Sequence, residues 1–283
     1  MIAFDYSNEE GQFKVKFKSV SRKPLTWKEE VVNTAKVIAE STNKPLYIFM
    51  SGGIDSELVA RVLLQNNIKF KALVLKHKNN TNGHDTIYAD EFCKENCIEQ
   101  EIIEFDIREF DYHIEKYITQ GYRATNIYHY LQLILLQRVE SLGGFGIGGA
   151  GEQIYYTIDN EVHIKINPCY TLGMDWCKRN NTWHQFWFFN SNPELFASYI
   201  QHKLINFLLN DPSYFINHYP ASTEKKIIIH KEWPEIKRRN KYNGFEQFEQ
   251  NYKLQKENEL KDRFPDIIDM YVPISAVKEQ LCI

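Results

Sequence analysis

The residues whose types and spacing best suit ligand binding or catalysis form a short loop, SGGIDS (residues 51–56). It directly follows the apolar run LYIFM (residues 46–50). Gly52 and Gly53 carry no side chain, so a ligand can approach the backbone closely at these positions. A helix that begins near Asp55 would offer its unpaired N–H groups and the positive end of its dipole to an anion. Ser51 and Ser56 add hydroxyl donors. Together these features predict a phosphate-binding loop.

Asp55 would repel a phosphate unless a cation lay between the two anions. Magnesium is commonly held in this way, by one or two carboxylates together with the phosphates of a nucleotide. We therefore expect Asp55 to bind Mg²⁺ beside a nucleotide. The alternative is a tight turn that binds no ligand, with Asp55 as a helix cap. This alternative accounts for fewer of the residue types in the loop than a phosphate site does.

The elements around this loop alternate between strands and helices. Strands are expected at 46–50, 71–77, 101–107 and 144–149, and helices at 56–65, 84–96, 109–119 and 127–141. Such alternation is typical of an α/β protein with an open, mostly parallel sheet and helices on both faces. Ligands bind beyond the carboxyl ends of the strands in these sheets, which is where both glycine-rich segments, 51–56 and 143–151, would lie.

Three regions are expected along the chain. Residues 1–44 form an N-terminal extension, with a hairpin or edge strand before residue 20 and a helix capped at Thr26. Residues 45–156 form the nucleotide-binding α/β core. Residues 157–283 contain a strand at 161–166 but are otherwise mainly helical, at 194–210, 223–231 and 245–262. We expect this last region to pack on the sheet and complete the active site.

The loop SGGIDS resembles the pyrophosphate loop of the ATP pyrophosphatase (PP-loop) superfamily. Two other stretches are similar to the synthetase domain of asparagine synthetase: GGAGEQ at 148–153, and EKKIII at 224–229 with the later residues Arg239, Lys241 and Phe245. The resemblance covers roughly residues 45–250 as separate motifs. It implies a fold of the adenine nucleotide alpha hydrolase (HUP) type, with ATP and Mg²⁺ as cofactors.

The resemblance also implies roles for individual residues. Asp55 and Glu152 would hold magnesium, and Lys225 would stabilise the charge that develops on the phosphates. These three residues are the expected catalytic groups. Residues expected to bind ATP or pyrophosphate are Ser51, Gly52, Gly53, Asp55, Ser56, Leu75, Gly148, Gly149, Lys225, Arg239 and Lys241. The reaction would cleave ATP to AMP and pyrophosphate while adenylating a carboxylate or amide of a small-molecule acceptor.

Two departures from asparagine synthetase limit the comparison. Position 2 is Ile2, where that family has the catalytic cysteine of its glutaminase domain. We therefore expect ammonia, a substrate amine or a separate ammonia-supplying partner to deliver the nitrogen. Gly149 stands where the family has a glutamate that assists the acceptor chemistry, so aspartate is expected to be a poor substrate.

Three other functions are alternatives to this one. The glycines at 144–151 also fit a dinucleotide fingerprint, but a strand-like segment follows them where a helix is needed. A net charge of −3 and a pI near 6.3 disfavour nucleic acid as a partner, although a base- or tRNA-modifying PP-loop enzyme remains an alternative. The other alternative is a protein that binds a nucleotide without catalysing a reaction. The sequence has no long apolar run and no signal peptide, and its number of cysteines, five, is odd. These features predict a cytoplasmic protein without membrane association.

Some side chains are left without a chemical role. The histidines at 77, 84 and 113 have no partner motif. The aromatic stretch WHQFWFFN (residues 183–190) is assigned to the core, and the question whether one or two of its rings line the acceptor pocket is left open.

Overall fold

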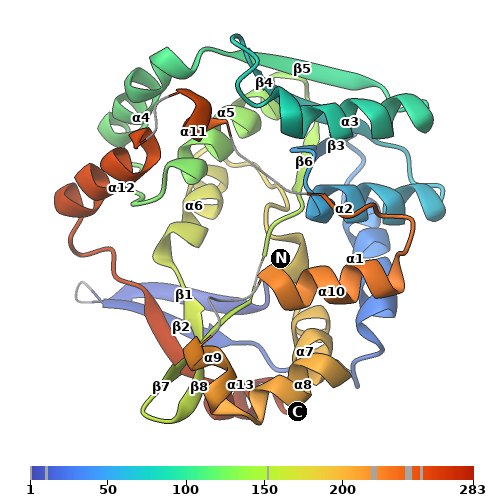
Figure 1. The fold of residues 1–283 in the computed structure, drawn as a ribbon, viewed down its shortest axis with the longest axis vertical. Helices are drawn as coiled ribbons and strands as arrows, with labels where there is room; N and C mark the ends of the chain where they lie inside the picture. The colour runs from blue at the N-terminus through green and yellow to red at the C-terminus, as the bar shows by residue number, and fades with distance from the viewer. Residues whose placement is uncertain (1, 10–11, 152, 218–221, 240–243, 249–250) are drawn as a thin grey trace.

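A four-stranded parallel sheet forms the centre of the computed structural model, with the strand order β5-β4-β3-β6 (Figure 1). The structure describes residues 2–9, 12–151, 153–217, 222–239, 244–248 and 251–283. The four strands are β3 (Leu46–Phe49), β4 (Lys71–His77), β5 (Gln100–Phe105) and β6 (Phe145–Gly148). The expected α/β class with a mostly parallel sheet is confirmed.

Helices cover both sides of this sheet, with α2 and α3 on one side and α4 and α5 on the other (Figure 1). Their bounds are α1 (Trp27–Glu40), α2 (Ile54–Gln65), α3 (Gly83–Glu95), α4 (Phe110–Thr119) and α5 (Ile127–Ser141). The helix α1 begins with the capping box expected at Thr26. The Thr26 hydroxyl accepts a hydrogen bond from the Glu29 N–H, and the Glu29 carboxylate accepts one from the Thr26 N–H.

Strand order explains why the carboxyl end of β3 is the place for a ligand. From β3 the chain passes to β4 and then β5 on one side, whereas β6 pairs with β3 on the other side. The loops that leave β3 and β6 therefore diverge and leave a crevice between them, as at the switch point of other open α/β sheets. Both glycine-rich segments lie at this crevice.

The hairpin β1–β2 and the strands β7 and β8 lie in the lower part of the molecule in Figure 1, whereas α11 and α12 lie at the upper left beside α4. An antiparallel hairpin of β1 (Phe4–Glu9) and β2 (Gln12–Phe17) confirms the expectation for the N-terminus. A second sheet has the order β7-β8-β9, made of β7 (Ile154–Ile158), β8 (Glu161–Ile166) and β9 (Met270–Pro273). The strand β9 was not expected, because its four residues are too few to show an alternating pattern.

Short helices fill the C-terminal region. They are α6 (Leu172–Arg179), α7 (Pro193–Gln201), α8 (Lys203–Leu209), α9 (Pro212–Asn217), α10 (Ser222–Glu232), α11 (Phe245–Phe248), α12 (Tyr252–Arg263) and α13 (Ile274–Leu281). Single 3₁₀ turns occur at Ile107–Glu109, Pro168–Thr171 and Phe188–Asn190. No helix in the described part of the chain is long and apolar enough to cross a membrane.

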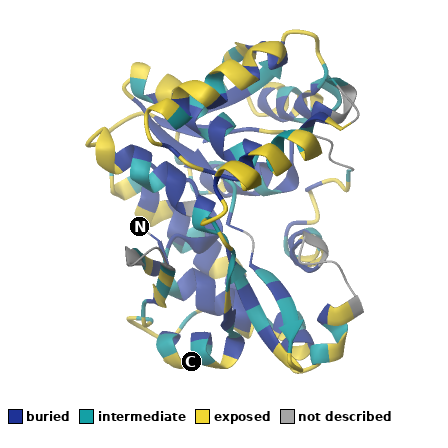
Figure 2. Cartoon of the chain, turned by 90° about the vertical axis from the view of Figure 1, so that its left-hand side faces the viewer, coloured by how far each residue is buried: buried dark blue, intermediate teal, exposed yellow. Residues whose placement is uncertain are grey.

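Buried residues lie along the strands of the parallel sheet and on the inward sides of the helices, in both the upper and the lower half of the molecule (Figure 2). The two ends of the chain are joined by hydrogen bonds. The Val20 N–H donates to the Leu281 carbonyl at 3.1 Å, and the Phe17 N–H donates to Gln280 Oε1 at 2.8 Å. The division into an extension, a core and a C-terminal region stays a prediction.

Candidate active site

The SGGIDS loop connects the buried end of β3 to the first turn of α2, as expected. Gly52 has a φ of +76°, and a Cβ added to it would lie 1.8 Å from the Asp85 carbonyl oxygen. Only glycine fits this position, because any side chain would collide with the backbone of α3. Gly53 is the N-cap of α2 in an extended conformation and has no side chain to cap the helix. The N-terminus of α2 is therefore open to an anion.

The second glycine-rich segment packs directly against this loop. A Cβ at Gly149 would lie 2.7 Å from the Ser56 nitrogen and 2.9 Å from the Asp55 carbonyl carbon. Gly148 is equally confined, since a Cβ there would lie 2.6 Å from the Phe186 carbonyl oxygen. The backbone of the segment after β6 thus touches the first turn of α2. This contact supplies a physical reason for glycine at 149, where the resembling family has glutamate.

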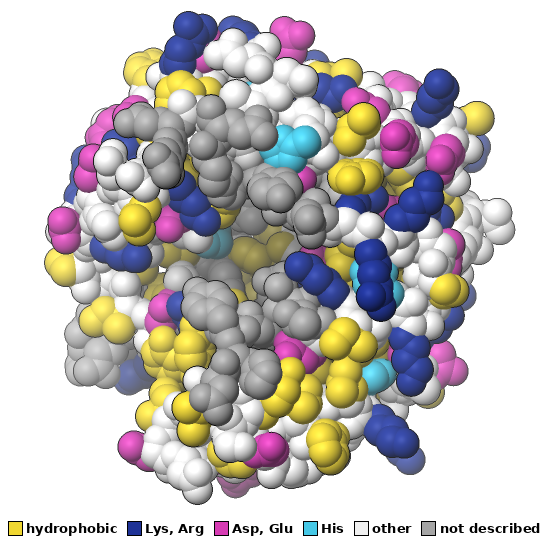
Figure 3. Space-filling view, in the orientation of Figure 1, with side chains coloured by type: hydrophobic (Ala, Val, Ile, Leu, Met, Phe, Trp, Pro, Cys, Tyr) yellow, Lys and Arg dark blue, Asp and Glu magenta, His cyan; other side chains and the backbone are white. Residues whose placement is uncertain are grey.

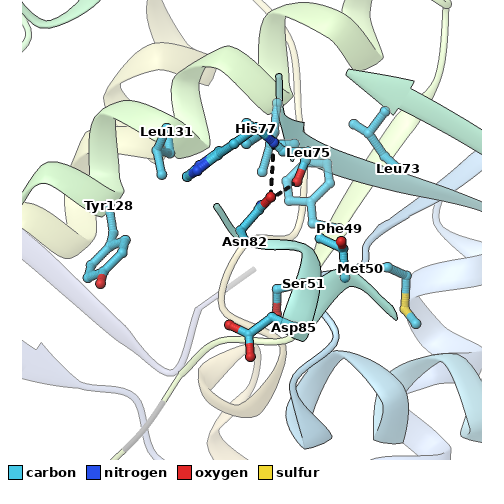
Figure 4. Close-up of a pocket in the computed structure, with 12 residues that line it drawn as sticks. Phe49, Met50, Ser51, Leu73, Leu75, His77, Asn82, Asp85, Tyr128 and Leu131 are labelled. Atoms are coloured by element: carbon cyan, nitrogen blue, oxygen red, sulfur yellow. Dashed lines mark hydrogen bonds between the residues drawn. The ribbon is translucent and has the colours of Figure 1, made fainter. Parts of the chain in front are cut away.

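Two adjoining cavities open beside these loops. The first has a volume of about 440 Å³ and lies along the carboxyl ends of β3 and β4 (Figure 4). The second has a volume of about 520 Å³ and lies over the SGGIDS loop, the residues after β6 and the start of α5. Both are lined by Phe49, Ser51, Tyr128, Leu131 and Leu135. The two cavities therefore adjoin each other along these residues.

Most of the predicted loop residues line these two cavities. Ser51 lies where the two cavities meet, and Leu75 lines the first cavity. The predicted residues that line the second are Gly53, Asp55, Ser56, Gly148 and Gly149. Gly52 is not part of either wall but shapes the loop through its contact with α3. Glu152 and Lys241 lie outside the described residues, so their predicted roles stay predictions.

Lys225, from α10, is brought to the loop by the tertiary structure. Its Nζ lies 2.9 Å from Asp55 Oδ1 and 4.7 Å from the centre of the Phe189 ring. The lysine is 3 % exposed, while 27 % of the Asp55 side chain is exposed. The structure thus joins two residues that the sequence places 170 positions apart, an ammonium and a carboxylate, at the N-terminus of α2.

Arg239 takes a different position from the one its predicted role suggests. Its guanidinium forms an ion pair with Glu57 in the first turn of α2 and lies 4.6 Å from the centre of the Tyr88 ring. Glu57 also accepts a hydrogen bond from Arg61 Nε at 2.7 Å. Arg239 does not line either cavity. In this structure it neutralises a buried carboxylate, and a role in phosphate binding stays a prediction.

Other residues at the site had no recognisable signal in the sequence. The sequence shows no partner motif for His77, yet this residue lines the first cavity. Burial lowers the pKa of its imidazole to about 4. His129 lines the second cavity, and burial lowers its pKa to about 4 as well. Both rings are therefore neutral at pH 7. Asp85 lines the first cavity at the start of α3, and only its place after a strand could have indicated it.

The aromatic stretch at 183–190 is mostly core, as expected. The four aromatic residues at 186–189 are all buried, and Phe186 and Trp187 also line the second cavity. Figure 3 shows a hollow near the middle of the molecular face, with Lys and Arg side chains gathered beside it over α10. Lys226 and Lys231 of α10 are exposed.

Comparisons with known proteins give similar solved structures but no matching sequence family. No protein-family model and no curated protein matches the chain. An NMN synthetase from Francisella tularensis is similar over 85% of this chain and 94% of its own, with 14% identity and a TM-score of 0.38. An NH3-dependent NAD synthetase from Campylobacter jejuni, in complex with the nitrate ion, has the same coverage, 15% identity and a TM-score of 0.34.

A predicted subunit of a tRNA methyltransferase from Methanocaldococcus jannaschii is similar over 50% of this chain and 67% of its own, with 15% identity and a TM-score of 0.34. At TM-scores below 0.5, none of these likenesses decides the function of this chain.

Proposed function

We propose that this protein is an ATP-dependent ligase that forms AMP and pyrophosphate while adenylating a carboxylate or amide of a small molecule. The observation that carries the proposal is the joining of two glycine loops at the switch point of the sheet. There Asp55 lines a cavity and is paired with Lys225 at 2.9 Å. Backbone N–H groups, a carboxylate and a buried ammonium at one helix N-terminus suit a polyphosphate with its cation.

The described residues fit magnesium in part. Asp55 is the only acidic residue among the described lining residues of the second cavity, and no cluster of three potential ligands occurs in the described part of the chain. Mg²⁺ bound to a nucleotide needs only one or two protein carboxylates, because phosphates and water complete its shell. Asp55 would hold the ion, with Glu152 as the proposed second ligand. The bound ion would neutralise charge on the departing pyrophosphate.

The residues of the chain have separate tasks in this proposal. The loop backbone and the two serines bind the phosphates, and the apolar first cavity takes the nucleoside. Lys225 exchanges its contact with Asp55 for one with the phosphates, since both partners then gain a new counter-charge. The second cavity takes the acceptor, which would lie against Asn126, His129 and Gln132 in the cavity wall. Ammonia, an amine or a separate ammonia-supplying protein would provide the nucleophile.

Product analysis tests the reaction class. We expect AMP and pyrophosphate, together with ATP–pyrophosphate exchange, when Mg-ATP is supplied with a panel of carboxylates and amides, each with and without ammonium. Glutamine should be inert as a nitrogen source, and aspartate should react poorly. Stoichiometric ADP, measured by chromatography, would contradict the proposal. Nucleotide binding without exchange for any acceptor would favour a binding protein instead.

A pair of variants tests the site. Asp55→Asn should lower the affinity for Mg-ATP at least tenfold, measured by calorimetry, because the carboxylate that would hold the ion is gone. Asp90→Asn is the matched control, since Asp90 also pairs with a lysine, Lys76 at 2.7 Å, but lies outside both cavities. Equal affinities for the two variants would place the nucleotide elsewhere.

A further inference from the structure

The strand β4 extends beyond its neighbour at the wall of the first cavity. The strand β3 ends at Phe49, which is paired with Leu73, while β4 continues to His77. The Met50 N–H donates to the Leu73 carbonyl at 2.9 Å, so the peptide groups of Leu73 face β3. Every second residue of a strand faces the same neighbour. The Leu75 carbonyl and the His77 N–H therefore point to the side where β3 has ended.

One side chain, Asn82, satisfies both of these backbone groups. Its Oδ1 accepts a hydrogen bond from the His77 N–H at 2.9 Å, and its Nδ2 donates one to the Leu75 carbonyl at 2.9 Å (Figure 4). Asn82 is 7 % exposed and lines the first cavity. The edge of β4 that faces the cavity is thus closed by a carboxamide.

A carboxamide presents an acceptor and a donor side by side. The N1 and the 6-amino group of adenine present the same pair, whereas hypoxanthine and guanine present the reverse, an N1–H donor and an O6 acceptor. We infer that Asn82 is a built-in occupant of the edge at which this site would read a nucleobase, and that it suppresses selectivity for adenine. This inference rests on the proposed nucleotide-binding function.

The surroundings hold Asn82 in place. Gly244, just before α11, has a φ of +82°, and a Cβ there would lie 2.9 Å from Asn82 Cβ and 3.0 Å from its nitrogen. The loop is further fixed by a 2.6 Å hydrogen bond between Thr81 Oγ1 and His77 Nδ1. The His77 ring lies 5.8 Å from the Phe245 ring. Gly244 therefore confines the backbone and Cβ from which the Asn82 carboxamide reaches the edge of β4.

The test compares the affinities of ATP and ITP, which differ only at the base edge in question, for the full-length protein with magnesium. In the wild type we expect the two affinities to agree within about threefold. In Asn82→Ala we expect ATP to bind roughly tenfold more tightly than ITP, since two hydrogen bonds become available to adenine alone. Asn96→Ala is the control. It removes a carboxamide that donates to the Phe92 carbonyl at the other end of α3, so its ATP-to-ITP ratio should match the wild type.

Each outcome decides the matter. A folded Asn82→Ala protein with an unchanged ratio overturns the inference but leaves nucleotide binding standing. A wild type that already prefers ATP tenfold also overturns it. Failure of both proteins to bind either nucleotide removes the proposed function and the inference together. If Asn82→Ala does not fold, Asn82→Ser replaces it. The serine side chain is too short to reach both the His77 N–H and the Leu75 carbonyl, so the ratio should shift in the same direction.

Discussion

At the scale of single residues, the site depends on charges that are compensated inside the protein. Lys225 is almost fully buried, and its ammonium lies beside the Asp55 carboxylate. A buried charge that loses an ionic partner is costly, whereas removal of both partners can be nearly neutral. Substitutions at Asp55 therefore change stability as well as ligand binding, and the two effects have to be measured separately.

A double-mutant cycle separates them. Asp55→Ala should lower the free energy of unfolding by about 2 kcal/mol, less than for a fully buried pair because Asp55 is partly exposed. Adding Lys225→Met should restore part of that loss, because the buried ammonium is then absent. Urea unfolding of the wild type, both single variants and the double variant gives the coupling energy. Strict additivity would mean that the pair contributes nothing to stability.

His129 makes the stability depend on pH. Burial lowers the pKa of its imidazole in the folded protein to about 4, from an ordinary value of 6.5. Between these values the unfolded chain binds a proton that the folded protein does not, so stability falls as the pH falls. The full shift corresponds to about 3 kcal/mol. His129→Gln should reduce the loss of stability between pH 7 and pH 4.5, measured by urea unfolding. An NMR titration showing the ring protonated at pH 6 would contradict this.

At the scale of elements, two backbones in contact shape the wall of the second cavity. The N-terminus of α2 and the segment after β6 touch at Ser56 and Gly149, where no room exists for a side chain. The orientation of α2 therefore depends on a residue in a different loop. Any side chain at 149 would push the N–H groups of α2 away from their positions in the cavity wall.

Gly149→Ala tests this contact. We expect a loss of about 1–3 kcal/mol of stability from overpacking and a nucleotide affinity at least tenfold lower. Gly143→Ala is the control, because its Cβ would meet nothing within 4 Å and its cost is backbone strain at a φ of +64°. Calorimetry should show unchanged nucleotide affinity for Gly143→Ala. Unchanged affinity for a folded Gly149→Ala would show that the contact does not position the SGGIDS loop for binding.

At the scale of the whole molecule, the last strand and helix close the lower part of the fold. The strand β9 completes the sheet beside β8, and α13 is hydrogen-bonded to the segment after β2. Four of their apolar residues are buried: Val272, Ile274, Val277 and Leu281. Each buried aliphatic side chain contributes about 1.5–3 kcal/mol. Their sum is of the same order as the whole stability of a typical domain.

Deleting residues 270–283 should therefore prevent stable folding of the entire chain, including the parallel sheet. We expect the truncated protein to lack a cooperative thermal transition by circular dichroism and to bind no nucleotide. Leu254→Ala in the full-length chain is the comparison, because this side chain is 59 % exposed and its removal should change the stability by less than about 0.5 kcal/mol. A truncated chain that melts cooperatively would show that the α/β core folds independently.

The sequence determined the parallel sheet and the loop at its edge. Apolar runs that alternate with helical periods specify β3 to β6 locally. The pair Gly52–Gly53 before Asp55 marks the loop between β3 and α2, because the backbone conformation there depends on adjacent residues. The capping box at Thr26 was readable for the same reason: its two hydrogen bonds join residues three positions apart. The strand β9 could not be predicted from the sequence, because it forms only through pairing with β8, more than 100 residues earlier.

Only the tertiary structure decided which distant side chains meet at the loop. It brought Lys225 to Asp55 and paired Arg239 with Glu57 instead. Neither contact has a local pattern, because each depends on how α10 and the segment that holds Arg239 pack against α2. Lys225 and Arg239 show the limit clearly: their charges are visible in the sequence, but their partners are set by packing.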